Sequence, residues 1–424
     1  MMNSRKILIA IVSLLSLMLL CVSLYLLPPV HSRLSWRLAS LQTKIHYFLN
    51  PPDQVTFSTV QEEPNLTTNS SPTIIVNTPT PTITPSVTPT LLLSPTATLT
   101  PTAIPESITL SGVPHEYQSF NNCGPANLSM LLNYWGWEGD QRTTKAILRP
   151  NEDDSNVMPE EMVAFIENNT NLSAIVRFGG DIPTLKKLVA SGFPVIIEIG
   201  HHPPDDWWMG HYLVVNGYDD AWMKLITQDS LIMADFPVPY QELESHWWRD
   251  FNNVFVVAYP KARKVELISI LGANFDQQEN LRLTLSKVES ELPALTGRDL
   301  FFGYLNQAEL LFKLGNQEEA ARIYDQAFSH YNTLDEKQRP WRVLWYRVNA
   351  YQTYYEVNRY QSVIDLASTT LAFLNKRGLE ESHYWRGMAF QALGEMDKAR
   401  FDYEIAIQLR PTYQEALLAL ESLE

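Results

Sequence analysis

The spacing of hydrophobic residues changes along the stretch from residue 108 to residue 262. Apolar residues three and four positions apart predict amphipathic helices, whereas short, nearly continuous apolar runs rich in Val and Ile predict strands. The pattern predicts helices at 124–135, 159–167 and 183–190, and strands at 174–178, 194–199, 211–216, 222–227 and 253–259. Because the helices come first and the strands cluster later, we expect an α+β domain with a largely antiparallel sheet.

A helical periodicity continues from there to the C-terminus. Three segments, starting at Tyr304, Arg347 and His383, place small and aromatic residues at matching positions. The middle copy is degenerate, with Asn358 where the others carry a turn glycine. These spacings resemble tetratricopeptide repeats, in which small residues let paired helices approach. We expect an all-α repeat domain that offers a concave surface for a peptide or protein partner, or a structural platform, with further helices at 278–292 and 413–423.

An uncharged apolar run occupies residues 7–27 and follows Arg5 and Lys6. The run is long enough to cross a bilayer as a helix, and no cleavage site of small residues follows it. We predict a single-pass signal anchor in the membrane, with the bulk of the chain extracytoplasmic. Apolar residues within 28–50 recur at spacings of three and four, which predicts an amphipathic helix that lies on the membrane or packs on another subunit.

From residue 51 to residue 107 the chain is rich in Pro, Thr and Ser and carries no Lys or Arg. A segment with so few large apolar residues cannot bury a core, so we expect a disordered, extended linker. At ~3.1 Å per residue, its proline-rich second half could hold a domain up to roughly 100 Å from the membrane.

Composition restricts the possible partners. The chain has 424 residues and a formal net charge of −15. That negative charge argues against a nucleic-acid surface, so we expect no nucleic-acid partner. The length allows two or three domains, and the 45% hydrophobic content is ordinary for globular protein.

Cys123 is the leading candidate for chemistry, in the stretch Q-S-F-N-N-C-G-P-A. The other of the two cysteines, Cys21, lies in the N-terminal apolar run, so Cys123 has no intramolecular disulfide partner. At the start of a predicted helix, unpaired backbone N–H groups and the positive end of the helix dipole favour a thiolate. The alternative is a small buried core cysteine.

His211 and Asp229 flank a predicted hairpin. If its turn is centred near Asp220, His211 faces Asp229 in the antiparallel ladder, and their Cβ atoms lie ~4.5–5.5 Å apart. The carboxylate would then fix the imidazole tautomer and leave the other ring nitrogen to take a proton from Cys123. Gln118 could present its amide N–H to an oxyanion. The alternatives are a strand-end histidine bonded to backbone, a turn-forming aspartate and an ordinary surface glutamine.

A rival constellation lies in the loop G-H-H-P-P-D-D-W-W-M-G-H. Imidazoles and carboxylates could bind zinc, but adjacent histidines in a proline-containing loop have no fixed facing geometry, so we expect no metal and no cofactor. We expect instead that this loop borders the cleft, where Trp207 and Trp208 bind substrate or simply pack. The residues of the rival site are His201, His202, Asp205, Asp206 and His211.

Together these motifs resemble a known family. Q-x4-C-G-P-A at a helix start, then G-H-Y-L-V-V-N-G-Y-D-D, then a strand followed by Q-D-S, is similar to the papain-like cysteine peptidases of the bacteriocin-processing group, family C thirty-nine, over 113–259. The resemblance implies a papain-like fold in which Cys123 is the nucleophile, His211 the general base, Asp229 the residue that orients it, and Gln118 part of the oxyanion hole. No transporter domain accompanies the motifs, so the leader-peptide substrates of transporter-linked members are not implied.

We therefore predict a membrane-anchored, extracytoplasmic cysteine peptidase that cleaves peptide or amide bonds, with a repeat domain that binds substrate or a partner. The alternative is a non-catalytic, peptide-binding scaffold with a peptidase-like fold. The predicted segments are a cytoplasmic tail at 1–6, the anchor at 7–27, the amphipathic segment at 28–50, the linker at 51–107, the peptidase-like domain at 108–262 and the repeat domain at 263–424.

Overall fold

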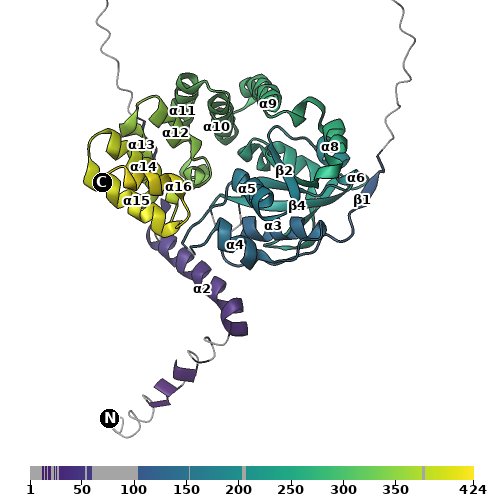
Figure 1. Ribbon diagram of the computed structural model, residues 1–424, viewed down its shortest axis with the longest axis horizontal. Coiled ribbons are helices and arrows are strands. Elements are labelled where there is room, and N and C mark those ends of the chain that lie inside the picture. The colour runs from purple at the N-terminus through teal and green to yellow at the C-terminus, as the bar shows by residue number, and fades with distance from the viewer. Residues whose placement is uncertain are drawn as a thin grey trace, which may run out of the picture.

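The computed structural model describes residues 28–52, 55–59, 104–151, 153–202, 207–374 and 378–424, together with isolated positions between 12 and 25. Figure 1 shows a sheet-containing body beside an arc of helices, with helix α2 (Pro28–Leu49) extending from the junction of the two. Most of the predicted membrane anchor, 7–27, lies outside the described residues. Among the helices that are described, none has the length and apolar character needed to span a bilayer.

The sheet-containing body confirms the predicted α+β class. Its described strands pair antiparallel in the order β2-β7-β3-β4-β5-β6, and β1 pairs with β4. Strands β1 and β6 were not predicted. The strands are β1 (Ser107–Thr109), β2 (Leu172–Arg177), β3 (Val195–His201), β4 (Met209–Asp219), β5 (Lys224–Asp229), β6 (Met233–Pro239) and β7 (Phe255–Pro260).

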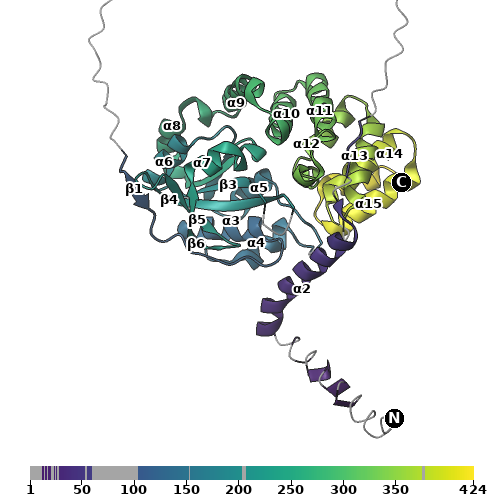
Figure 2. The same ribbon diagram turned by 180° about the vertical axis from the view of Figure 1, so that it is seen from behind.

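Helices cover both faces of the sheet, as Figures 1 and 2 show from opposite sides. Successive residues of a strand point to opposite faces. Leu213 of β4 therefore packs in one buried cluster with α6 (Ile182–Ala190) and α8 (Lys264–Leu271). Val214 packs in another with α3 (Cys123–Tyr134) and α5 (Pro159–Asn169). Burial on both faces explains why the central strands are nearly continuous apolar runs.

The predicted register of the β4–β5 hairpin is wrong. Val214 faces Gln228 and Asp219 faces Lys224, so β5 is displaced by two or three residues from the prediction. The turn is wider than expected and is closed by a hydrogen bond from the Met223 N–H to the Asp220 carbonyl at 3.2 Å. A bulge also interrupts the ladder between Val215 and Gly217. As a result His211 lies diagonally across from Asp229 rather than directly opposite it.

The arc of helices contains the three predicted hairpins. Gly315 and Gly394 adopt positive φ angles of 85° and 79° at two of the interhelical turns, and Asn358 adopts 59° at the third. Asparagine tolerates this left-handed conformation, so the degenerate copy keeps its turn. The helices are α9 (Gln277–Glu291), α10 (Gly297–Lys313), α11 (Gln317–Tyr331), α12 (Asn349–Glu356), α13 (Tyr360–Ala372), α14 (Glu380–Ala392), α15 (Met396–Leu409) and α16 (Gln414–Glu421).

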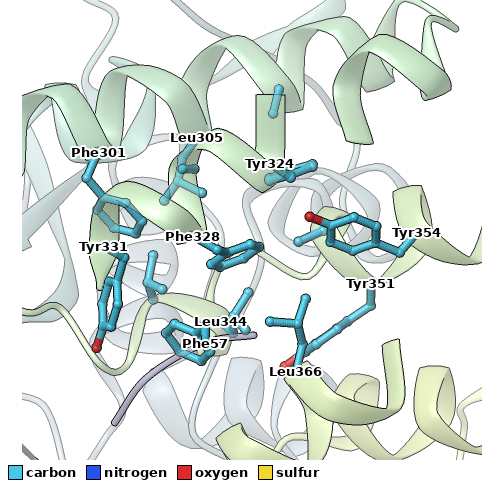
Figure 3. Packing of buried hydrophobic residues seen from close by; sticks show 14 of the residues in the cluster. Phe57, Phe301, Leu305, Tyr324, Phe328, Tyr331, Leu344, Tyr351, Tyr354 and Leu366 are labelled. Carbon is cyan, nitrogen blue, oxygen red and sulfur yellow. The ribbon is translucent and has the colours of Figure 1, made fainter. Parts of the chain in front are cut away.

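The linker prediction is wrong for residues 55–59, because these residues are packed into the helical core. Phe57 is 1% exposed, and its ring centroid lies 5.4 Å from that of Phe328 and 4.9 Å from that of Tyr331 (Figure 3). The Phe57 backbone N–H donates to Asn332 Oδ1 at 3.2 Å, and Asn332 Nδ2 donates to the Phe57 carbonyl at 2.8 Å. The linker prediction is also wrong at 104–107, because Ser107 opens strand β1 and the Pro105 carbonyl accepts a hydrogen bond from the Tyr218 hydroxyl at 2.7 Å. Residues 60–103 lie outside the described residues.

Asp250, which is 1% exposed, joins the two bodies. Its Oδ2 accepts a hydrogen bond from Trp208 Nε1 at 2.7 Å, and its carboxylate pairs with Arg298 of α10. Gly200 of β3 is required at this contact, since a Cβ there would overlap the Asp250 carboxylate. Trp208 stacks on Phe251 with a centroid distance of 5.6 Å. These contacts fix the orientation of the helical arc against the sheet.

The burial of residues 55–59 predicts that removing their packing lowers the stability of the protein. Phe57→Ala should lower the free energy of unfolding of the full-length chain by ~3–5 kcal/mol, because it removes a buried ring and leaves a cavity. Phe48→Ala is the matched control: Phe48 is 82% exposed, and its loss should change stability by at most ~0.5 kcal/mol. Chemical denaturation followed by tryptophan fluorescence measures both. Equal effects of the two substitutions would show that residues 55–59 do not dock.

Candidate active site

Cys123 opens helix α3 and is half-buried. Gly124 lets this helix start lie close to a neighbouring loop, because a Cβ at that position would come within 3.0 Å of the Val157 Cβ and 3.1 Å of the Met162 Cε. Asn122 is the N-cap residue but makes no side-chain capping bond. Pro125 has no N–H and the Ala126 N–H donates to the Asn122 carbonyl at 3.0 Å, so Gly124 is the first-turn residue whose N–H bonds the sulfur.

One buried amide ties the start of α3 to the sheet. The two hydrogens of Asn127 Nδ2 are shared among three acceptors, the Cys123 carbonyl at 2.9 Å, the Tyr212 carbonyl of β4 at 2.8 Å and Ser230 Oγ at 3.1 Å. Tyr212 follows His211 in the same strand, so these bonds place Cys123 beside His211. Asn127 was not predicted as a site residue, and its only signal in the sequence is its position one helical turn after the cysteine.

His211 lies between Cys123 and Asp229. Its Nε2 is 3.0 Å from Asp229 Oδ1, and both side chains are almost fully buried. The same Oδ1 accepts the backbone N–H groups of Leu231 at 2.8 Å and Ile232 at 3.1 Å. His211 also hydrogen-bonds the Cys123 thiol, and because Nε2 faces Asp229, Nδ1 is the ring nitrogen that faces the sulfur. The structure thus brings together the side chains of Cys123, His211 and Asp229.

Electrostatics at the site favour a charged pair. Burial raises the pKa of Cys123, but the hydrogen bond and positive charge of His211, with backbone N–H groups of Tyr212 and Gly124, lower it below the ordinary value. Burial lowers the pKa of His211, but the charge and hydrogen bond of Asp229, then those of Cys123, raise it to about 10. At neutral pH the arrangement therefore stabilises a thiolate beside an imidazolium.

Gln118 is held at the site by Ser230. The Gln118 backbone N–H donates to the Ser230 carbonyl at 2.8 Å, and Ser230 Oγ donates to Gln118 Oε1 at 2.8 Å. Since Oε1 is the accepting end of the amide, the Nε2 end keeps its N–H groups for another acceptor. Ser230 is the third letter of the Q-D-S motif, whose first two residues end β5, but its role in holding Gln118 is visible only in three dimensions.

The loop proposed as a rival metal site has a packing role. Trp208 is buried at the junction described above, which confirms packing for this residue. The Trp207 ring meets Tyr47 of α2 at 5.6 Å between centroids, and the Trp207 carbonyl accepts from Arg342 at 3.3 Å. No group of three metal-binding side chains is found among the described residues, and Asp205 and Asp206 lie outside them.

Comparison with known proteins agrees with this geometry. The model of the peptidase C39-like family matches residues 110–256. This region is a peptidase C39-like domain. A tetratricopeptide-repeat model matches residues 380–413, which hold the third predicted hairpin, so the C39-like domain is followed by tetratricopeptide repeats.

Individual proteins resemble parts of the chain. Aryl-hydrocarbon-interacting protein-like 1 from Mus musculus is 23% identical over 40% of this chain and 52% of its own length, and the Bos taurus protein is 25% identical over 36% and 46%. The chain thus spans about half the length of these curated relatives. A solved structure from Bacillus anthracis, described as a C39-like peptidase, is 20% identical over 36% of this chain and 98% of its own, with a TM-score of 0.31.

The charged pair predicts how thiol alkylation depends on pH. An isolated thiol ionises near pH ~8.5, so the lowered pKa of Cys123 should keep it reactive toward iodoacetamide well below that pH. His211→Ala removes the main cause of the lowering and should slow alkylation at pH 6.5 by roughly ten- to a hundredfold. Mass spectrometry of a Cys21→Ser background measures the rate at Cys123 alone.

The unfolded chain in denaturant supplies the control for this experiment, since its thiol should ionise at the ordinary value. A folded wild-type profile that coincides with the unfolded profile would contradict the charged pair.

Proposed function

We propose that this protein is a cysteine peptidase that hydrolyses peptide or amide bonds. The observation that supports the proposal most directly is His211, which bonds Asp229 through one ring nitrogen and the Cys123 thiol through the other. This is the arrangement that a thiol nucleophile requires: a base within hydrogen-bond reach, held in one tautomer by a third group.

In the first half of the proposed reaction, the Cys123 sulfur attacks the carbonyl carbon and a C–S bond forms. The carbonyl oxygen becomes an oxyanion, which the Gln118 amide and the Cys123 backbone N–H stabilise. The His211 imidazolium then gives its Nδ1 proton to the departing amine, and the C–N bond breaks. Asp229 stabilises the imidazolium and keeps the ring in place. The product is a thioester on Cys123.

In the second half, a water molecule attacks the thioester carbon while His211 Nδ1 takes a proton from that water. The C–S bond then breaks and the carboxylic acid leaves. The proton taken from water stays on His211, so the thiolate–imidazolium pair is restored. Each step uses the same hydrogen bonds, so no rearrangement of the site is needed between the halves.

We further propose that residues 7–27 anchor the protein in a membrane with the C39-like domain and the repeats outside the cytoplasm, and that the repeats bind a protein partner or substrate. The uncharged run after Arg5 and Lys6 supports the anchor. Helix α2 supports a short connection to it, because Tyr47 near its end is 2% exposed and packs on Trp341 at 5.1 Å between centroids.

Substitution of the nucleophile tests the catalytic proposal. Cys123→Ser should reduce hydrolysis of a fluorogenic peptide library to background with unchanged thermal unfolding, because a serine hydroxyl lacks the low pKa of the thiol. Gln118→Ala should reduce kcat by roughly a hundredfold while KM changes little, as expected for a group that acts on the transition state. Full activity of the Cys123→Ser variant would refute Cys123 as the nucleophile, whereas absence of hydrolysis by the wild-type chain would leave the non-catalytic, peptide-binding scaffold as the better account.

Removal of the anchor tests the proposed location. The full chain should sediment with the membrane fraction and resist extraction by high salt, whereas a chain that lacks 7–27 should remain in the supernatant. Protease added to intact spheroplasts should digest a C-terminal tag on the full chain. A protected tag would reverse the proposed orientation, and a soluble full chain would refute the anchor.

A further inference from the structure

A cavity of about 560 Å³ lies between the C39-like domain and the repeats. Glu198 of β3 and Tyr346, which precedes α12, both line it. Both side chains also lie close enough to Cys123 to interact electrostatically with its thiolate. Tyr346 covers Gly210, where an added Cβ would come within 2.8 Å of its ring, and Gly210 adjoins His211. The cavity is therefore next to the candidate nucleophile, and its volume is typical of ligand pockets.

The chemistry of the cavity is that of cation binding. Each of its three resident cations pairs with a carboxylate and also lies over an aromatic ring, a combination that stabilises a desolvated positive charge. The sets are Lys313 with Glu160 and Phe178, Arg347 with Glu309 and Phe251, and Arg410 with Glu161 and Tyr413.

Carboxyl groups outnumber these cations. Among the residues that the structure describes, no ion pair joins Glu198, Glu381 or Glu415 of the cavity to a lysine or arginine. Glu198 is 4% exposed and hydrogen-bonds the Tyr212 hydroxyl, whose own proton is donated to the Val157 carbonyl at 2.8 Å. Glu198 must therefore donate in the bond to Tyr212, and burial raises its pKa well above the ordinary value, which agrees with a protonated group.

We propose that this cavity receives the cationic side chain of a peptide, a lysine or arginine close to the scissile bond, and that Glu198 and Tyr346 recognise it. The proposal names the substrate class of the peptidase proposed above and rests on it. An anionic side chain would find the three lining cations already paired with carboxylates, and an apolar one would leave the polar groups of the cavity without a partner. A guanidinium or ammonium group favours loss of the Glu198 proton to solvent, so that the resulting carboxylate pairs with the cation, and it can lie against the Tyr346 ring.

The repeats take part in this recognition. Tyr346, Arg347, Glu309 and Glu381 all belong to the helical arc, whereas Glu198 and Glu160 belong to the C39-like domain. Neither part encloses the cavity alone. The repeats would thus contribute to substrate selection because their residues form one side of the cavity. They could also bind a partner on their outer surfaces.

Protection of Cys123 from alkylation tests the inference without requiring cleavage. The full-length chain, with Cys21→Ser, is treated with iodoacetamide in the presence of a short peptide amide that contains arginine, or the same peptide with citrulline, which has nearly the same shape and no charge. The arginine peptide should protect Cys123 at a concentration at least tenfold lower than the citrulline peptide. Equal protection by the two peptides would overturn the proposal.

A matched pair of variants locates the recognition. Glu198→Gln should remove the advantage of arginine and leave protection by the citrulline peptide unchanged. Glu244→Gln, at an exposed position outside the cavity, should keep the advantage. If the arginine peptide still protects Cys123 better than the citrulline peptide in Glu198→Gln, Glu198 is not the group that recognises the cation. If Glu198→Gln does not fold, the arginine–citrulline comparison on the wild-type chain still decides.

The outcome is separable from that of the peptidase proposal. Charge-dependent protection without hydrolysis of any peptide would retain the cation site and refute the peptidase. Hydrolysis that shows no preference between arginine and citrulline peptides would retain the peptidase and refute the cation site.

Discussion

The arrangement of the site depends on the contact between the first turn of α3 and strand β4. A single buried side chain, Asn127, donates to oxygens of the helix, the strand and the loop after β5. These three oxygens belong to segments that carry Cys123, His211 and Asp229 or lie next to them. The thiol and the imidazole meet because the backbones that hold them share the N–H groups of this amide, and burying those N–H groups without an acceptor would be costly.

Around that contact the protein stabilises charges that a buried site would otherwise exclude. Burial alone disfavours a thiolate, an imidazolium and a carboxylate. Each charged form is stable because its neighbour in the series Cys123, His211 and Asp229 carries the opposite charge. The Asp229 carboxylate also accepts the backbone N–H groups of Leu231 and Ile232. Glu198 lies on the neighbouring strand without such a partner and stays protonated. The same environment thus produces a charged row and, close by, a neutral acid.

Much of the C39-like domain is predictable from the sequence, because its strands are continuous apolar runs and its helices follow a 3.6-residue period. Cys123 and His211 were assigned for physical reasons that the geometry matches, whereas Asp229 was assigned from a direct cross-strand pairing and contacts His211 from a diagonal position instead. The hairpin register was not predictable, since it depends on a four-residue turn and a bulge that leave no pattern of their own. The role of Ser230 depends on a contact with Gln118, 112 residues away in the chain.

The domain junction was equally hidden from sequence analysis. Glu198 sits within an apolar strand and gives no sign that it faces a cavity, because the opposite wall comes from residues more than a hundred positions later. Phe57 stands in a segment whose composition indicates disorder. Its burial follows only from the space between Phe328 and Tyr331 and from the side-chain amide of Asn332, which pairs with its backbone as a neighbouring strand would.

Docking of Phe57 changes what the proline-rich stretch can do. Thr59 bonds Tyr354 on the repeats, and residue 104 leads directly into β1 on the other body, so 60–103 leaves and returns to one folded unit. If residues 7–27 anchor the chain as proposed, the length of this stretch therefore does not set the distance between the folded unit and the membrane. A single proteolytic nick within it would give two polypeptides that stay associated through the Phe57 and Tyr47 contacts. Shedding of the folded unit from a membrane would require a cut before α2.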